Sequence, residues 1–101
     1  MTPLDSVHRF DWDAGNERKS HDKHGVTQSE AEQVFFNAPL LVMDDKKHSE
    51  HESRWHALGQ TDQGRALHIT FTLRDGNKAL RVISARDMHR KEKAVYEQAK
   101  P

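Results

Sequence analysis

The chain has 101 residues, of which 34% are hydrophobic and 32% charged, so we expect one domain, 1–101, with a modest core. Its formal net charge is zero and it has no cysteine, which excludes a disulfide framework and a thiolate zinc site and fits the reducing cytosol. No apolar run resembles a signal peptide or a membrane span, so we expect a cytoplasmic protein with no membrane contact.

The first elements are predicted from alternation and from capping residues. Residues 1–7 form a loose leader, and Arg9–Trp12 alternates apolar and charged residues as a short strand does. Asp13 is placed to cap a helix that runs to about Lys23, with Gly25 as the residue that stops it.

A second helix is predicted from a capping box formed by Thr27 and Glu30. Ala31, Val34 and Phe35 fall on one side of this helix, as expected of a face that packs on a core. The Asn-Ala-Pro sequence that follows ends the helix.

The rest of the chain predicts a meander of strands followed by a last helix. The expected strands are Leu40–Met43, Arg54–Gly59, Arg65–Arg74 and Ala79–Arg86, with turns at 61–64 and 75–77. The last helix is expected at Met88–Glu97, with a thin apolar stripe of Met88, Val95 and Ala99 and a frayed end at 98–101.

The strand Arg65–Arg74 has the clearest alternation in the chain. Leu67, Ile69 and Phe71 point to one side, whereas His68 and Thr70 point to the other. On the next strand, Ile83 and Ala85 are expected on one face and Ser84 and Arg86 on the opposite face. These patterns predict an α+β fold in which two N-terminal helices cover one sheet face and leave the other open for a ligand.

Charge is distributed unevenly along the chain. Residues 1–53 carry six Lys and Arg against eleven Asp and Glu, whereas residues 54–101 carry ten against five. Residues 78–93 alone have a net charge of +4, where the last strand meets the last helix. A cation-rich corner of this kind is typical of a site for a polyanion.

The open face carries residue types that RNA cleavage without a metal requires. A base must help the 2′-OH attack phosphorus, cations must stabilise the phosphorane, and an acid must protonate the leaving oxygen. Arg86 and Arg90 supply cations, and Lys23 and His24 end the first helix, where lysine can reach a phosphate. The alternative is a solvated face with surface ion pairs, such as one from Asp87 to Lys91.

The chain has eight histidines, and two pairs are spaced i, i+3: His21 with His24, and His48 with His51. A histidine metal protein is therefore an alternative, but the spacing lacks a supporting motif such as H-E-x-x-H and we expect neither metal nor cofactor. Trp12 and Trp55 lie near apolar positions, so both are predicted to be core residues rather than platforms on which bases stack.

Several short motifs occur together in a characteristic order. They are Phe10-Asp11-Trp12-Asp13, Lys23-His24-Gly25-Val26, Glu30-Ala31, Val34-Phe35-Phe36, His48-Ser49-Glu50, Arg54-Trp55, Leu58-Gly59, Ile83-Ser84-Ala85-Arg86, and a basic helix with Arg90, Glu92 and Tyr96. In this order and spacing, over residues 9–97, the chain resembles the BrnT family of toxins from bacterial type II toxin–antitoxin pairs.

The resemblance implies a RelE-like fold, with a twisted antiparallel sheet of four to five strands, two helices packed on it and a C-terminal helix. It implies a ribonuclease toxin that arrests translation and is neutralised by a BrnA antitoxin, which alone contacts DNA. The site residues it implies are, by position, Arg65, Arg86, Arg90, Lys23, His24 and Tyr96.

The sequence departs from the RelE-like pattern at two points. The chain is neutral rather than basic, and Asp87 places an anion inside the basic cluster, where it could orient Arg90 or Lys91. A catalytically degenerate module that only binds antitoxin or RNA is therefore the alternative to an active enzyme.

Overall fold

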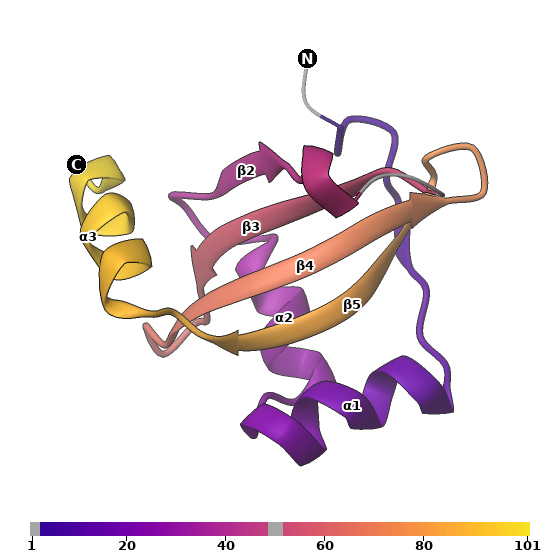
Figure 1. Ribbon diagram of the computed structural model, residues 1–101, viewed down its shortest axis with the longest axis horizontal. Helices are drawn as coiled ribbons and strands as arrows, with labels where there is room; N and C mark the ends of the chain where they lie inside the picture. The colour runs from indigo at the N-terminus through magenta and orange to yellow at the C-terminus, as the bar shows by residue number, and fades with distance from the viewer. Residues whose placement is uncertain (1–2, 49–51) are drawn as a thin grey trace.

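A computed structural model describes residues 3–48 and 52–101 (Figure 1). Its elements, in chain order, are β1 (Arg9–Phe10), α1 (Ala14–His24), α2 (Gln28–Val34), β2 (Leu41–Asp44), the 3-10 helix η1 (Lys46–His48), β3 (Arg54–Gln60), β4 (Ala66–Arg74), β5 (Ala79–Asp87) and α3 (Arg90–Ala99). The predicted elements are therefore present, with boundaries that differ by one or two residues for most of them.

The strands form a single five-stranded sheet in the order β1-β5-β4-β3-β2. β2 to β5 are antiparallel neighbours, as predicted, but β1 runs parallel to β5, with Arg9 opposite Ala79 and Phe10 opposite Leu80. The sheet is mixed because β1 and β5 run in the same direction, and their parallel pairing is possible because α1, α2 and the three strands β2, β3 and β4 connect them. The α+β prediction is confirmed, whereas a wholly antiparallel sheet is wrong.

The first two helices begin where their capping residues predict, and α1 ends as predicted at Gly25, whereas α2 ends at Val34, before the predicted Asn-Ala-Pro stop. The Asp13 carboxylate accepts hydrogen bonds from the Gly15 and Asn16 amides, and Gly25 ends α1 with a φ of 65°. The Thr27 hydroxyl accepts from the Glu30 amide, while the Glu30 carboxylate accepts from the Thr27 amide, which completes the capping box. These starts and the end of α1 therefore follow from the local sequence.

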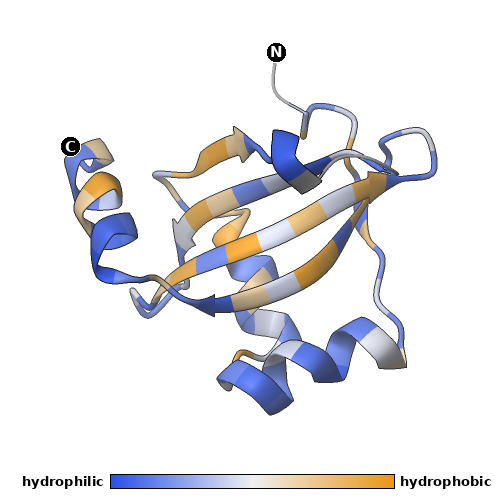
Figure 2. Ribbon diagram, in the orientation of Figure 1, coloured by the Kyte–Doolittle hydropathy of each residue, from blue (hydrophilic) through white to orange (hydrophobic). Residues whose placement is uncertain are grey.

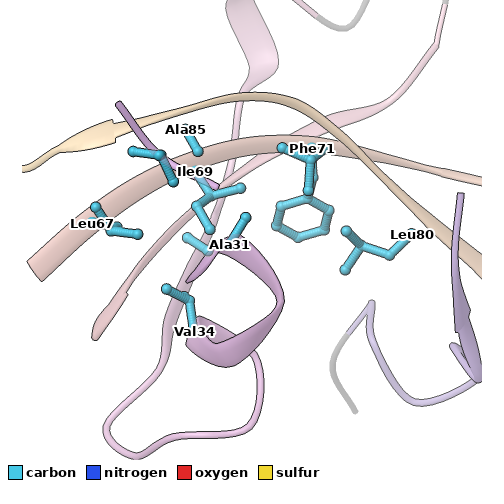
Figure 3. Close-up of a cluster of buried hydrophobic side chains, with 10 residues drawn as sticks. Ala31, Val34, Leu67, Ile69, Phe71, Leu80 and Ala85 are labelled. Carbon is cyan, nitrogen blue, oxygen red and sulfur yellow. The ribbon is translucent and has the colours of Figure 1, made fainter. Parts of the chain in front are cut away.

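The main core lies between the sheet and α2. Strand residues with 0–2% of their surface exposed meet the buried side of α2, as Figure 3 shows for Ala31, Val34, Leu67, Ile69 and Phe71. Along β4, buried hydrophobic residues alternate with more polar ones, which is visible in the hydropathy colouring of Figure 2. Trp12 and Trp55 pack against this core, as predicted.

Helix α1 covers the edge of β5 with polar rather than apolar contacts. Its buried residues are Asn16 and Ser20, and the helix is largely hydrophilic in Figure 2. The Asn16 amide donates to the Val82 carbonyl (3.1 Å), and the Ser20 hydroxyl accepts from the Ala85 amide (2.8 Å). These side chains satisfy backbone groups that would otherwise be unpaired at the sheet edge.

The opposite face of the sheet is less open than predicted. η1 lies in front of this face in Figure 1, while α3 packs at one end of it over a second cluster of Leu58, Met88 and Tyr96. His68, expected on an open surface, is only 9% exposed, and Thr72, two strand positions beyond Thr70 on the same face, is only 1% exposed. The face is therefore a polar surface flanked by η1 and α3, which we call the α3 face.

The apolar stripe predicted for α3 is wrong. The helix starts at Arg90, so the buried Met88 lies before it, and Val95 and Ala99 are both exposed. Val95 is 53% exposed, whereas Tyr96 is 1% exposed and its hydroxyl donates to the Pro39 carbonyl at 2.7 Å. Tyr96 is thus the residue that anchors α3 to the rest of the fold.

A register irregularity in β5 overturns one predicted face. The pairing of β4 with β5 shifts between Thr70 and Phe71, so that Val82 and Ala85 are both buried in the core while Ile83 is not part of it. An extra residue at a bulge changes which neighbours share a face. Ser84 and Arg86 remain opposite Thr70 and His68, on the α3 face, as predicted.

The described ends of the chain are better packed than predicted. Leu4 and Val7 contact the main core, and α3 continues to Ala99. None of the helices in the described part of the chain has the length and apolarity that crossing a bilayer requires. His51 of the i, i+3 pair His48–His51 lies outside the described ranges.

Candidate functional site

The predicted cations divide between the two sides of the sheet. Arg65 precedes β4 and contacts the turn between α1 and α2, whereas Arg86 of β5 contacts α3. The sequence predicted a single corner holding both arginines. The structure instead forms two arginine–carboxylate clusters, and Asp87 links them. Its carboxylate pairs with Arg65, and its backbone carbonyl accepts from Arg86.

Every N–H donor of the Arg65 guanidinium has a partner. Nε and Nη2 donate to the two Asp87 oxygens (2.8 and 3.1 Å), and Nη1 donates to Glu30 Oε2 (3.0 Å). The remaining donors reach the carbonyl oxygens of Gly25 (3.0 Å) and His24 (3.3 Å). Arg65 therefore joins the α1–α2 turn to the ends of β4 and β5, and an incoming phosphate would have to displace one of these partners.

The charges of this cluster stabilise one another. Hydrogen bonding to Arg65 lowers the pKa of Asp87, and hydrogen bonding to the Thr27 amide, with a further contribution from Arg65, lowers the pKa of Glu30. The pKa of Arg65 is raised, chiefly by Asp87. Asp87 thus pairs with Arg65 and not with Lys91, the partner suggested for it in the alternative of a solvated face.

Lys23 and His24 end α1 with exposed side chains. His24 reaches the Arg65 cluster through its backbone carbonyl, and its imidazole lies close enough to contribute to the lowered pKa of Asp87. The structure therefore brings His24 to Arg65, on the helix side of the sheet. It does not show either Lys23 or His24 in contact with Arg86.

Arg86 is bound in a bidentate pair by Glu92 of α3. Nη1 donates to Oε1 at 2.8 Å and Nη2 to Oε2 at 2.9 Å, and Nη1 also donates to the Asp87 carbonyl at 3.1 Å. This pairing lowers the pKa of Glu92 to about 2. Glu92 also accepts from the His89 amide (2.8 Å), so the same carboxylate caps α3 and holds Arg86.

The remaining predicted site residues have different surroundings. Arg90 is exposed in the first turn of α3, beside the exposed Lys91 and near Lys93. Tyr96 belongs to the same helix, but its side chain is buried, and burial raises the pKa of its hydroxyl. Arg90 therefore extends the cationic surface around Arg86, whereas Tyr96 faces the Pro39 carbonyl.

Two residues that sequence reasoning missed lie on the α3 face. His56 of β3 sits opposite Thr70, and its Nε2 lies 3.0 Å from Oδ2 of the buried Asp45. The alternation of β3 would have placed His56 on this face, because Trp55 and Ala57 point into the core. Asp45 follows β2 in an irregular segment, where no periodic signal predicts the direction of a side chain.

His68 lies between His56 and the Arg86–Glu92 pair. Its ring centroid is 4.7 Å from that of His56, and its Nε2 is 3.8 Å from Glu92 Oε2. Burial, and then the positive charge of Arg86, lowers the pKa of His68 to about 4, so the ring is neutral at pH 7. Its Nδ1 is buried and has no hydrogen-bond partner among the described residues.

The α3 face thus combines the partly exposed Arg86 guanidinium, two imidazoles and the hydroxyls of Thr70 and Ser84. These groups can bind a phosphate and move protons. Within residues 3–48 and 52–101, no three histidine, aspartate or glutamate residues are grouped so that they could hold a metal ion.

Comparison with known structures shows that the fold has a relative. A crystal structure of the Brucella abortus ribonuclease toxin BrnT superimposes with a TM-score of 0.60 and 23% sequence identity, covering 81% of this chain and 97% of that chain. At this level of identity the likeness establishes the fold. A comparison with curated proteins finds no match.

The chain is therefore a small α+β domain with the fold of this relative and a polar α3 face. Residues 12–92 match the sequence model described as the ribonuclease toxin BrnT of type II toxin–antitoxin systems. The chain belongs to this family. The family implies an RNA substrate and an antitoxin partner, and the resemblance inferred from the ordered motifs is confirmed.

Proposed function

We propose that this ribonuclease toxin cleaves RNA without a metal, by attack of the 2′-OH on the adjacent phosphorus, and thereby inhibits translation. The product would be a 2′,3′-cyclic phosphate on one fragment and a 5′-OH on the other. The observation that carries the proposal is Arg86, which is held by Glu92 beside two imidazoles and two hydroxyls on the α3 face.

Arg86 would bind the scissile phosphate and stabilise the phosphorane charge. Its side chain is 25% exposed, and its bonds to Glu92 and Asp87 fix the direction of the guanidinium. A preorganised cation of this kind stabilises a transition state without reorganisation at the moment of reaction. The exposed Arg90 would contact neighbouring phosphates, so that affinity falls as salt rises.

The other predicted site residues take supporting roles in this proposal. Arg65 would keep Asp87 and the α1–α2 turn in place, because all its donors are already used. Lys23 and His24, exposed on the helix side, would contact RNA that extends past the edge of the sheet. Tyr96 would seat α3, and with it Glu92, against the sheet.

The partner would be a BrnA-like antitoxin that wraps the toxin, and DNA contact would occur only through that antitoxin. The support is the membership of the toxin–antitoxin family, which implies an antitoxin. We place the activity in the cytoplasm, where RNA, ribosomes and a cognate antitoxin meet.

The test is the chemistry of RNA ends. Purified protein incubated with RNA should yield cyclic phosphate and 5′-OH ends at the same rate with and without a chelator, and its induced expression should stop growth and bulk translation. Arg86→Gln should produce far fewer ends, while Arg74→Gln, at the far end of β4, should match the natural protein. Cleavage that stops on chelation, or growth that continues at good protein levels, would refute the proposal.

A second candidate is a module that binds antitoxin or RNA without cleaving. It is favoured by the way the cations are already neutralised, Arg65 by Asp87 and Glu30, and Arg86 by Glu92. In that case RNA would be retained in a binding assay while no new ends form.

A further inference from the structure

A chain of three polar residues lies near Arg86 on the α3 face. Asp45, at the junction of β2 and η1, is 8% exposed, and its Oδ2 lies 3.0 Å from Nε2 of His56. Nδ1 of His56 lies 3.0 Å from the hydroxyl oxygen of Thr70. A carboxylate, an imidazole and a hydroxyl therefore follow one another toward the middle of the sheet.

The partners of His56 determine the protonation of its ring. A carboxylate only accepts hydrogen bonds, so the neutral ring carries its proton on Nε2, facing Asp45. Nδ1 then accepts from the Thr70 hydroxyl. A buried carboxylate in this position holds the tautomer and stabilises the imidazolium when a proton arrives.

Building on the proposed ribonuclease function, we propose that Asp45, His56 and Thr70 form the proton relay of the cleavage reaction. Thr70 Oγ1 takes the proton of the RNA 2′-OH and passes its own proton to Nδ1 of His56, as the bond between the 2′-oxygen and phosphorus forms. The imidazolium then returns its proton through Thr70 to the 5′-oxygen as that oxygen leaves phosphorus. The proton lost at the 2′-oxygen is thus gained at the 5′-oxygen, and the protein is unchanged.

The strand register puts this relay at the correct separation from Arg86. Thr70 is opposite Ser84, and Arg86 is opposite His68, so Thr70 and Arg86 are diagonal neighbours on adjacent strands. Diagonal neighbours of this kind are about 7–8 Å apart, within reach of a long side chain. A phosphodiester can therefore contact the hydroxyl with its 2′-oxygen and the guanidinium with its non-bridging oxygens.

Of the two imidazoles on the α3 face, His56 rather than His68 is the one that exchanges protons in this relay. The titratable groups facing it are Asp45, from the β2–η1 junction, and His68, from β4, with Arg86 of β5 and Glu92 of α3 beyond His68. His68 stays neutral near pH 7, since burial lowers its pKa to about 4. His68 therefore separates the relay from the Arg86–Glu92 pair and adds no charge of its own to it.

The first experiment measures single-turnover RNA cleavage as a function of pH. The natural protein should lose rate as pH falls and the imidazole takes up a proton. His56→Gln should lower the plateau rate about 10²–10⁴-fold, the range expected for general acid–base catalysis. It should also abolish the decrease in rate at low pH, which we call the acid limb. His21→Gln, on the exposed side of α1, is the matched control and should keep both rate and limb.

The Thr70 hydroxyl provides a second test that preserves side-chain shape. Thr70→Val removes the hydroxyl and should reduce the rate to that of His56→Gln, while Thr70→Ser should retain most of it. Nitrogen chemical shifts of the His56 ring give a readout independent of activity and of the variants' folding. They should report a proton on Nε2 in the natural protein, and Asp45→Asn should disturb this tautomer.

The outcomes separate failure of the relay from failure of the ribonuclease proposal. If the natural protein leaves no cyclic phosphate ends, both are wrong. If it cleaves and His56→Gln or Thr70→Val keeps the rate and the acid limb, the relay is wrong and the ribonuclease proposal stands. A ring protonated on Nδ1 would also overturn the relay.

Discussion

The two arginine–carboxylate clusters of this protein have similar compositions and different surroundings. Every N–H donor of Arg65 donates to a carboxylate or a backbone carbonyl, and these acceptors come from three segments. The Arg86 guanidinium instead donates to the Glu92 carboxylate and to the backbone carbonyl of Asp87. Only Arg86 adjoins the imidazoles and hydroxyls of the α3 face. An arginine whose N–H donors all have protein partners organises the fold, whereas an arginine with donors left over is suited to a ligand. The local charge alone does not distinguish the two.

The largest expected effect is on catalysis and separates the two arginines. Arg86→Gln should lower kcat/KM for RNA cleavage by about 10²–10³-fold, the usual result of removing one preorganised donor to a transition-state charge. Arg65→Gln should lower it by less than about tenfold, because its role is to hold the α1–α2 turn. A larger catalytic loss for Arg65→Gln than for Arg86→Gln would reverse the assignment of the two clusters.

The second prediction concerns the response of the α3 face to acid. His68 has a pKa of about 4 in the fold, so the unfolded chain binds more protons as pH falls below about 6.5 and stability decreases between those values. Glu92, with a pKa of about 2, extends the loss from about 4.5 downwards. Both groups take up protons more readily in the unfolded chain, so each lowers the free energy of unfolding as pH falls. His68 does so at higher pH than Glu92.

Denaturant unfolding measured from pH 7 to pH 3 would check this sequence. The His68 contribution is at most roughly 3 kcal/mol, and His68→Gln should remove the part of the loss between pH 6.5 and 4. His8→Gln, outside the α3 face, is the control and should reproduce the natural curve. An unchanged pH dependence in His68→Gln would show that this ring is not buried in its neutral form.

The third prediction tests the helix-side cluster by stability. Arg65→Gln removes a guanidinium that bridges Asp87, Glu30 and the α1–α2 turn, and should cost about 1–3 kcal/mol, given its partial exposure. For a chain of this size, that corresponds to a fall in Tm of several degrees. Arg74→Gln breaks a more exposed pair with Glu52 and should change Tm by little. Equal shifts for the two variants would mean that the Arg65 cluster is ordinary surface charge.

Sequence reasoning reached the parts of this molecule that local chemistry determines. The caps at Asp13, Gly25 and Thr27 predicted the helix boundaries because a single side chain or a left-handed glycine defines each of them. The alternation of β4 identified both faces of the sheet. The ordered motifs led to the correct family.

The missing parts depended on tertiary contacts. The bulge in β5 placed Val82 rather than Ile83 in the core, and α3 packs against the fold through Tyr96 rather than Val95. Neither follows from periodicity, since both arise where one element meets another. The separation of Arg65 from Arg86 likewise required the strand register, which the charge count along the chain does not contain.

The smallest expected effect concerns how Glu92 is positioned beside Arg86. The Tyr96 hydroxyl donates to the Pro39 carbonyl, which ties α3 to the segment before β2. Tyr96→Phe removes this bond and keeps the ring, so it should cost about 1 kcal/mol in denaturant unfolding. Val95→Ser, on the exposed side of the same helix, should cost less than about 0.5 kcal/mol. If α3 positions Glu92 as the structure indicates, Tyr96→Phe should lower the cleavage rate slightly and Val95→Ser should leave it unchanged, whereas equal rates would show that the first turn of α3 holds Arg86 by itself.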